Sequence, residues 1–391
     1  MINFSPLCTN LKSSLETIRS LKTDFDAAYA AAISSGTPAE IQKAQDLKQA
    51  LETQTRELQE RVNTLEAEHL YDLRAQYESQ VTLLKRTGLI ETKTSTNETG
   101  QEQEVSFMRD IHGNEHSIPS YETIIHRFAE QKELFLTKAD QGFTKFLLVP
   151  FGMSLDQMIE KFRAYLLEYK KDHPEFGRLD PTKEDASDEP TWDPLWVDKE
   201  YTTGADVNGT LVYDPQIFDK EHHNGVTKAR ILERQKTDRD PMLGWRMLFL
   251  QTDKDGKGFK AIPRIGEREI QGEQFPRLDL ETDKTPKEYL ARELVASQNS
   301  ASPYYGESGM SPEEWLVMFM SHLQETDKPI DHYQGNNREY DISTYLTGAY
   351  FPASRGVLYA GSYQHGRQIS LLQRNPIFGG GIIGVRCAVR G

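Results

Sequence analysis

One stretch of the sequence decides the fold of the C-terminal part: Ser311-Pro-Glu-Glu-Trp-Leu-Val-Met-Phe319. Serine supplies the N-cap, proline occupies the first helical position and Glu314 the third, which is the pattern of a capping box. This pattern predicts a helix over 311–325, with Trp315 as its anchor in the core. Thr285-Pro-Lys-Glu288 repeats the arrangement and predicts another helix over 285–296.

Short apolar runs between the helical segments indicate strands. Phe146 to Phe151 and Trp245 to Leu250 are rich in β-favouring residues and are bounded by glycine or proline. Two more strands, 105–111 and 115–118, flank a glycine-containing turn as in a β-hairpin. Further helical patterns cover about 120–138 and 154–171. Strands and helices are interspersed without a regular alternation, so we expect an α+β domain and not a doubly wound sheet.

A long polar segment interrupts this domain. Residues 178–242 are rich in Asp, Glu, Gly, Pro and Thr, and Trp192 and Trp196 are their main large apolar residues. Long loops in compact domains are either functional or poorly ordered. We expect an insertion of irregular structure that is packed down through the two tryptophans.

The N-terminal part has the periodicity of long helices. Leu11, Leu15, Ile18, Leu21 and Phe25 follow at steps of three and four, and Ala44, Leu51, Leu58 and Leu65 repeat every seven residues. Thr37-Pro-Ala-Glu40 separates the two patterns and starts the second helix. We expect a helical hairpin or coiled-coil arm over 1–90, with arms of about 28 and 50 residues.

Two alternatives remain for the apolar stripe of this arm. It is covered either by the other helix of the hairpin or by the same helices of another subunit, which would make the protein a homo-oligomer. The polar, acidic segment 91–104 then resembles a linker in composition. These features predict three parts: the arm 1–90, the linker 91–104 and the mixed domain 105–391.

Composition narrows the class of protein. The chain has 391 residues with a net charge of -14, which opposes non-specific attraction to nucleic acid. It has no apolar run long enough to insert into a membrane, and its first residues lack the pattern of a secretory signal. Its two cysteines, Cys8 and Cys387, lie at opposite ends. We expect a cytoplasmic or particle-associated protein without a disulfide framework.

The common signatures of catalysis and metal binding are missing from the sequence. There is no nucleophile elbow, Walker loop, dinucleotide fingerprint or His-Glu-x-x-His motif. Asp253-Lys-Asp-Gly-Lys-Gly258 lacks the glutamate that completes a calcium loop, so a β-turn between two strands is the better interpretation. We therefore expect no enzyme activity, no cofactor and no metal.

The C-terminal region differs in composition from the rest of the chain. Residues 342–391 contain neither Asp nor Glu but five arginines, a local charge of +5. Within 356–383, Lys, Glu, Met and Trp are all missing, and small, aromatic, aliphatic and arginine residues take their place. Average composition would put about four or five of the missing residues in a segment of this length.

Two motifs frame this segment, Tyr345-Leu-Thr-Gly-Ala-Tyr-Phe-Pro-Ala-Ser354 before it and Gly384-Val-Arg-Cys-Ala-Val-Arg390 after it. The second motif resembles the last strand of C-type lectin folds of the formylglycine-generating-enzyme type. Together the two motifs resemble the variable proteins of diversity-generating retroelements, found in candidate-phyla bacteria, archaea and their viruses. The resemblance covers most of 105–391 and is most specific over 311–390.

The resemblance implies a history and a function. In that family a reverse transcriptase substitutes at template adenines, often in Asn codons, and the resulting codons never encode Lys, Glu, Gln, Met or Trp. The composition of 356–383 fits this expectation if Gln364, Gln368 and Gln373 are unmutated framework positions. A glycine-rich surface hairpin without such a history is the alternative. The enzymes of this fold use a cysteine pair, but only Cys387 lies in this domain, so we expect it to be a small buried thiol.

Strand periodicity within 356–383 identifies the residues of the expected binding surface. Ser370, Leu372 and Arg374 alternate with Ile369 and Leu371, so one set faces outward and the other packs beneath. The candidate ligand-binding residues of this hypervariable surface are Leu358, Tyr359, Gly361, Tyr363, His365, Gly366, Ser370, Leu372, Arg374, Asn375 and Phe378.

Three functions remain for this surface. We expect a non-enzymatic protein that binds an unknown protein or other macromolecule. The first alternative is a structural or receptor-binding component of a viral particle, in which the same surface is a subunit contact. The local positive charge allows a third, nucleic acid, which the overall acidity opposes.

Overall fold

The chain folds into two compact units. The structure is a computed structural model that describes residues 4–96, 102–178, 182–331, 342–363 and 368–391. The first unit comprises Met1–Leu70 with Ile125–Glu130, and the second comprises Tyr71–Ile124 with Gln131–Gly391. The expected α+β class is confirmed. Within the described residues, the search for a helix with the length and apolarity of a membrane span found none.

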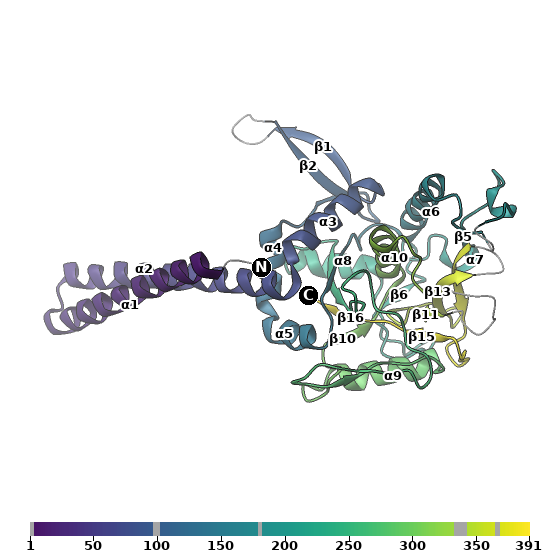
Figure 1. Ribbon diagram of the computed structural model, residues 1–391. Helices are drawn as coiled ribbons and strands as arrows, with labels where there is room; N and C mark the ends of the chain where they lie inside the picture. The colour runs from purple at the N-terminus through teal and green to yellow at the C-terminus, as the bar shows by residue number, and fades with distance from the viewer. Residues whose placement is uncertain (1–3, 97–101, 179–181, 332–341, 364–367) are drawn as a thin grey trace. The chain divides into compact units, whose positions relative to one another are not determined.

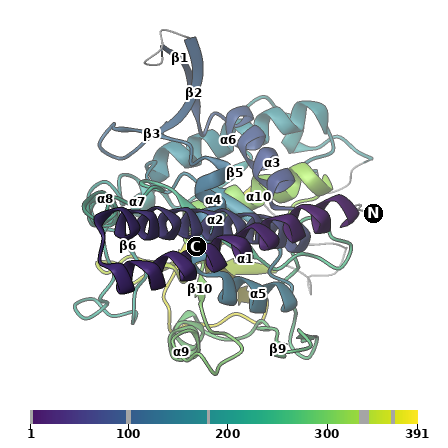
Figure 2. The ribbon, with the colours of Figure 1, turned by 90° about the vertical axis from the view of Figure 1, so that its left-hand side faces the viewer.

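The first unit contains the predicted helical hairpin. Helix α1 (Phe4–Ser35) and helix α2 (Pro38–Tyr71) lie side by side and antiparallel (Figure 2). Gly36 in the turn between them has a φ of 62°, a left-handed conformation that glycine adopts without strain. Ala28 and Ala44 are buried, whereas Leu15 remains exposed. Small residues thus allow the two helices to approach closely.

The second helix of this hairpin is shorter than expected. It ends at Tyr71 because Asp72 has a left-handed backbone, with φ 48° and ψ 44°. Helix α3 (Leu73–Arg86) follows and belongs to the second unit, where the Gln76 side chain donates to the Thr144 carbonyl at 2.9 Å and accepts from the Phe146 amide at 2.8 Å. The predicted arm of about 50 residues and the domain boundary at residue 90 were therefore wrong.

The predicted linker 91–104 is also wrong, because its described residues, 91–96 and 102–104, belong to two paired strands that form a β-ribbon. Strand β1 (Glu91–Thr96) pairs with β2 (Glu102–Arg109) from Glu91↔Phe107 to Thr96↔Glu102. The ribbon projects from the body of its unit (Figure 1). Because little of the protein covers it, both of its faces can carry polar side chains. The expected hairpin is present as well, since β3 (Glu115–Ser117) pairs with the end of β2.

A four-stranded antiparallel sheet forms one part of the core. Its strand order is β10 (Glu307–Gly309), β16 (Cys387–Arg390), β7 (Arg246–Leu250) and β4 (Lys145–Val149). Strands β4 and β7 are the two apolar runs predicted from the sequence, and nearly all of their side chains are buried. The turn expected after β7 is confirmed by an antiparallel bridge between Thr252 and Phe259.

Helices pack against this sheet and against one another. Helix α10 (Pro312–Thr326) contacts β4, α3 and α6 (Leu155–Asp172). Its predicted capping box between Ser311 and Glu314 is present, as is that of α9 (Pro286–Ser297). Trp315 is fully buried, as predicted. The helix expected over 120–138 is divided at Gln131 into α4 (Tyr121–Glu130) and α5 (Lys132–Asp140).

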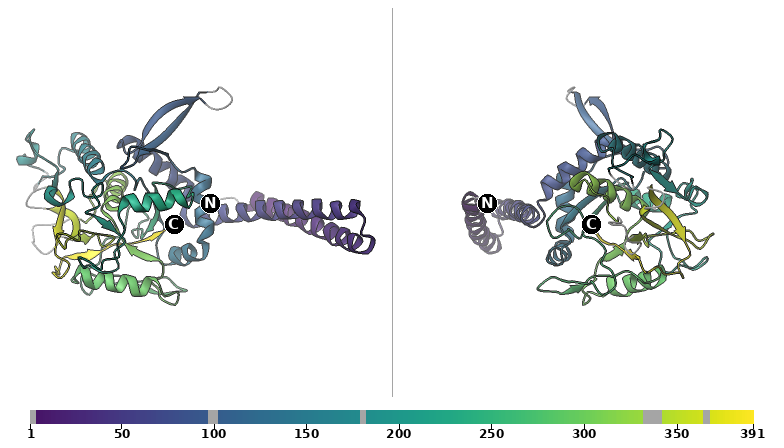
Figure 3. Two further views of the ribbon diagram at one scale, coloured as in Figure 1. Left: turned by 180° about the vertical axis from the view of Figure 1, so that it is seen from behind. Right: turned by 45° about the vertical axis from the view of Figure 1, so that its right-hand side comes forward.

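A second, five-stranded sheet contains most of the C-terminal region (Figure 3). Its strand order is β15 (Ile383–Val385), β11 (Ser343–Tyr345), β13 (Val357–Tyr363), β14 (Gln368–Arg374) and β5 (Leu195–Val197). The central pairs β11–β13 and β13–β14 are antiparallel, while β15 and β5 join at the two edges in parallel. The terminal motif thus supplies one strand to each sheet, β15 to this one and β16 to the other.

The predicted insertion 178–242 is less irregular than expected. Besides β5, the described residues of this segment form four short elements, which are the 3-10 helix Ala186–Asp188, α7 (Lys199–Thr202), β6 (Val212–Tyr213) and α8 (Lys228–Thr237). Strand β6 pairs with β12 (Ala349–Tyr350), and β8 (Ile270–Gln271) pairs with β9 (Arg277–Leu278) elsewhere in the unit. Through β5 and β6 this segment belongs to the body of the second unit.

The corrected boundary can be tested by truncation. A chain lacking residues 1–70 should keep a cooperative unfolding transition, because it retains the second unit. A chain lacking residues 1–90 also loses Gln76 and the buried Leu83 and Leu84, so its melting temperature should fall steeply. Thermal unfolding followed by circular dichroism measures both. Equal stability of the two truncated chains would contradict the assignment of α3 to the second unit.

Candidate functional site

The expected variable segment forms the middle of the five-stranded sheet. Strands β13 and β14 pair over seven positions, from Val357↔Arg374 to Tyr363↔Gln368. Strand β11 lies beside β13, and β5 lies beside β14. A hairpin held by neighbours on both sides has little freedom to change its register, so its side chains have defined faces.

The side chains on one face of this hairpin are buried in the second unit. Ile369 and Leu371 are buried, which confirms the prediction that these two residues form the framework. Leu358 and Ala360 alternate with Tyr359 on β13 and are buried too, Leu358 with 1% of its surface exposed. The inclusion of Leu358 among the surface residues was therefore wrong.

Two further candidate positions are covered although they lie on the outward row. Gly361 is paired with Ser370, and the Ser370 hydroxyl donates to the Gly361 carbonyl at 3.1 Å. Ser370 is only 3% exposed. A Cβ atom at Gly361 would lie 2.6 Å from Oγ of Ser343, which is closer than real contacts allow. The expected exposure of Ser370 was wrong, and Gly361 has no room for a side chain without movement of its neighbours.

The remaining candidates lie at the accessible end of the hairpin. Tyr359 and Leu372 are cross-strand partners, and both side chains are partly exposed. Arg374 is partly exposed as well, and its Nη2 donates to the Gly379 carbonyl at 2.9 Å, which joins β14 to the loop that follows. Asn375 is exposed, and Phe378 has 57% of its surface exposed.

Three candidate residues have no side-chain description. The backbone of Tyr363 ends β13, but the placement of its side chain lies outside the described part of the chain. His365 and Gly366 lie wholly outside the described residues. The structure therefore brings together Tyr359, Leu372, Arg374, Asn375 and Phe378 from the predicted set.

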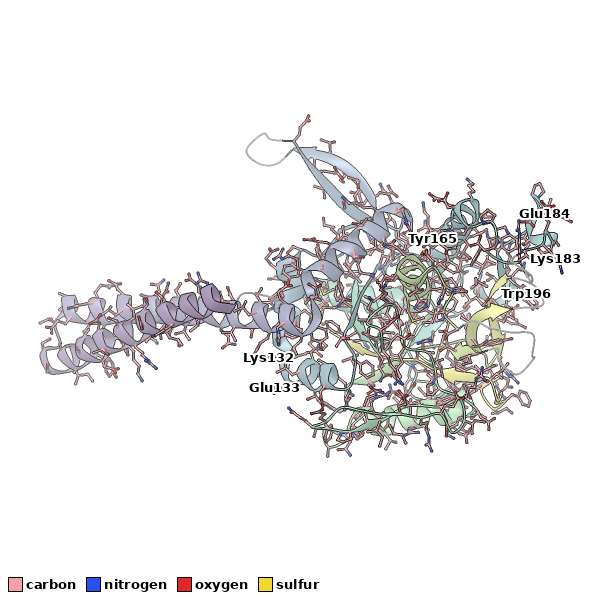
Figure 4. The ribbon with its side chains drawn as sticks, viewed as in Figure 1. Lys132, Glu133, Tyr165, Lys183, Glu184 and Trp196 are labelled. Carbon is pink, nitrogen blue, oxygen red and sulfur yellow. The ribbon has the colours of Figure 1, made fainter. Side chains whose placement is uncertain are left out.

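Sequence reasoning missed large apolar residues beside this group. Ile377 and Ile382 are exposed in the same loop as Phe378. Trp196, expected as a core anchor, lies on β5 at the edge of the sheet (Figure 4). Its side chain is 44% exposed, and its register partner on β14 is Ser370. The pattern Leu195-Trp-Val197 could have indicated this, because a strand that buries its two flanking residues turns the central one outward.

We call the group formed by Trp196, Tyr359, Leu372, Arg374, Asn375, Ile377, Phe378 and Ile382 the sheet surface. Trp, Tyr and Arg side chains are the ones most often found to contribute large binding energies at protein interfaces. The side chains of the sheet surface are therefore suited to non-covalent binding. The Tyr345 hydroxyl donates to the Phe378 carbonyl at 3.3 Å, so the loop that carries the exposed apolar residues is tied to the frame.

A buried carboxyl group forms a second feature of the same unit. Glu293 on α9 is 6% exposed and accepts a hydrogen bond of 2.9 Å from the Thr347 hydroxyl. Burial is the main cause that raises the pKa of Glu293 to about 8, and the nearby carboxylate of Glu307 adds to it. The Cys387 thiol lies 3.8 Å from Glu293 and is buried, as expected for this cysteine. Burial also raises the pKa of the Cys387 thiol, so it is a poor nucleophile at neutral pH.

A search for metal ligands gives no site in the part of the chain that the structure describes. There, no three His, Cys, Asp or Glu side chains are grouped so that they could hold a metal ion. Asp253, Asp255 and Gly256 belong to the turn after β7, where the Asp255 carboxylate accepts from the Lys257 amide at 2.9 Å. This carboxylate thus has a local structural role.

The raised pKa of Glu293 predicts how stability changes with pH. The folded chain holds a proton on Glu293 up to about pH 8, whereas an unfolded glutamate releases it near pH 4.3. Between these values the folded state binds more protons, so the free energy of unfolding should fall by up to about 1.4 kcal/mol per pH unit as the pH rises. Glu293→Gln should remove this slope, and the exposed Glu267→Gln should keep it. Urea unfolding across the pH range would contradict the assignment if all three chains had the same slope.

The chain was compared with family models, with curated proteins and with solved structures. None of the three comparisons gives a match. The functional argument therefore depends on the residues of the sheet surface and on the geometry described above.

Proposed function

We propose that this protein is a non-enzymatic ligand-binding protein, a variable protein of a diversity-generating retroelement whose second unit has a C-type-lectin-like fold of the formylglycine-generating-enzyme type. One observation carries the proposal. Within 356–383, partly or fully exposed residues such as Tyr359, Leu372 and Phe378 lie above a buried framework that includes Ile369 and Leu371. A diversified surface needs this separation, because its residues must change without unfolding the chain.

The chemistry of the sheet surface supports binding to a macromolecule. Tyr359, Phe378 and Trp196 offer large contact areas with few rotamers to immobilise, and Arg374 adds a planar hydrogen-bonding group. The exposed Ile377 and Phe378 lie next to each other in the chain at 60% and 57% exposure. Contiguous exposed apolar groups mark interaction sites in soluble proteins. The proposed ligand is a protein or another macromolecule.

The same features allow a second function. A structural or receptor-binding subunit of a viral particle would use the sheet surface as a contact between subunits, and a location in the cytoplasm or on a particle fits either proposal. The helical hairpin of the first unit then has one of two roles, a spacer or a site of self-association. Its exposed apolar residues, such as Leu15 and Tyr29, support self-association.

Nucleic acid is a less well supported ligand. Two of the five C-terminal arginines are engaged inside the unit, Arg386 with Asp331 and Arg390 with Glu314 and Asp214. Their charges are compensated by these carboxylates, so the local excess of positive charge at the surface is smaller than the composition indicates.

The proposal predicts which positions tolerate change. Combined substitution of Tyr359, Leu372, Arg374, Asn375 and Phe378 by small, polar or aromatic residues should cost little, since exposed substitutions usually stay within about 0.5 kcal/mol each. Alanine at the framework positions Leu358, Ile369 or Leu371 should cost about 2 to 5 kcal/mol. A displayed library sorted for folding, with the framework positions as the control set, measures the difference.

Equal intolerance of the two sets would show that the sheet surface is part of the core and would end the proposal. We expect Gly361 and Ser370 to behave as framework positions, because Gly361 has no space for a side chain and Ser370 is buried.

The DNA next to the gene distinguishes a diversified binding protein from a structural subunit of a particle. A reverse-transcriptase gene and a near-copy of the coding segment for 356–383 that differs at adenines support diversification, and their absence favours the structural subunit.

A further inference from the structure

A pocket of about 210 Å³ lies in the second unit, away from the residues of the sheet surface. Helix α9, strand β10, the turn between β11 and β12 and the segment after β6 form its walls. Drug-sized ligands occupy pockets of about 300–1,000 Å³. This pocket is therefore of a size for a single side chain or a small organic molecule.

The charged groups that line the pocket are paired, with one exception. Arg390 donates to the carboxylates of Glu314 and Asp214 at 2.9–3.0 Å. Glu307 accepts two hydrogen bonds of 2.8 Å from Arg277 and one of 2.6 Å from Lys138. These contacts satisfy both groups inside the protein wall.

Glu293 is the exception. Only 6% of its surface is exposed. Among the described residues, no basic group forms a salt bridge with its carboxyl group. Its partners, the Thr347 hydroxyl and the Cys387 thiol, are neutral. A buried carboxyl group without a cation holds a proton instead of a charge. Binding of a cation in the pocket would reverse this preference.

We propose that this pocket binds the primary ammonium group of a free short-chain aliphatic amine, with the Glu293 carboxylate as its counter-ion. The ammonium group has three donors, and Thr347, Ser297 and Gln298, whose side chains each carry an oxygen acceptor, are among the residues that line the same pocket as Glu293. Leu290, Leu294 and Pro215 provide apolar wall for the methylene groups.

Binding must release a proton. The protonated carboxyl group of Glu293 loses its proton to solvent as the ammonium ion enters, so one positive charge replaces another and the pocket stays balanced. The Arg390 guanidinium, which lines the same pocket, lowers the pKa of Glu293 but does not outweigh the effect of burial. The other titratable groups that face Glu293 keep their charge state. Burial would raise the pKa of Glu307 and of Asp214, but the neighbouring arginines outweigh it and lower both pKa values. Burial raises the pKa of Cys387 and so keeps it in its thiol form.

The proton release fixes the sign of the pH dependence. Below about pH 8 the affinity for the ammonium ion should rise about tenfold per pH unit, and above that it should level off. A neutral ligand that only accepts a hydrogen bond from protonated Glu293 would behave oppositely, and its affinity would fall above pH 8. The ligand amine itself stays protonated in this range, since alkylamines resemble lysine with a pKa of about 10.4.

The test uses the full chain and n-butylammonium chloride as the probe. Isothermal titration calorimetry at about pH 6, 7, 8 and 9, in two buffers of different ionisation enthalpy, gives the affinity and the number of protons released. Neutral n-butanol is the matched control ligand. Glu293→Gln keeps the shape of the protonated side chain but cannot take a charge, so it should lose at least tenfold in affinity at about pH 8. Glu267→Gln, an exposed carboxylate outside the pocket, is the matched control variant and should bind normally.

The outcomes separate clearly. Affinity that rises with pH, release of about one proton at pH 6–7 and loss of binding in Glu293→Gln support the proposal. Binding that is independent of pH, equal affinity for n-butanol, or normal binding by Glu293→Gln would overturn it. Absence of any binding by the unaltered chain at about pH 9 would overturn it as well, and this result does not depend on whether a variant folds.

Discussion

The carboxylate of Glu314 fixes the position of helix α10 on the four-stranded sheet. It accepts hydrogen bonds from Arg246 on β7 at 3.1 Å and from Arg390 on β16 at 3.0 and 2.9 Å, and the Ser311 amide donates to it at 2.8 Å. Burial alone would raise the pKa of Glu314, but the two guanidinium groups outweigh it and lower the pKa. A buried charge with this set of donors tolerates no displacement of either strand, because a lost partner would leave it uncompensated.

A second buried ion pair lies where the chain passes from one sheet to the other. Arg386 lies between β15 of one sheet and β16 of the other, and its Nη2 donates to the Asp331 carboxylate at 2.5 Å. The Trp315 indole donates to the same carboxylate at 3.1 Å. Helix α10 therefore binds Arg390 directly through Glu314 and reaches Arg386 indirectly, because Trp315 and Arg386 share the Asp331 carboxylate. One helix is thus linked to the segment that supplies a strand to each sheet.

Local signals in the sequence predicted the α+β class and several individual helices and strands, whereas contacts between residues distant in the sequence could not be predicted. The capping boxes at Thr285 and Ser311 depend on residues three positions apart, so both helices were predicted close to their observed bounds. The β1–β2 ribbon was missed because both of its faces carry polar side chains, which removes the alternation that marks a strand. The end of α2 was missed because the apolar stripe of the sequence continues past Asp72. The left-handed backbone of Asp72, which ends the helix, leaves no mark in the periodicity of the apolar residues.

The candidate site shows the same limit. Period-two alternation correctly separated Ile369 and Leu371 from Tyr359 and Leu372, but burial of Ser370 depends on what covers the sheet, which a strand pattern does not contain. Glu293 occupies an ordinary helical position, and only its neighbours Thr347 and Cys387 make it unusual. The buried ion pairs of the second unit explain how residues of the sheet surface could change without loss of the fold. They join residues outside 356–383, so replacement of the sheet-surface residues within that segment leaves those pairs intact. Under the proposed function, stability and recognition would therefore depend on different residues of the second unit.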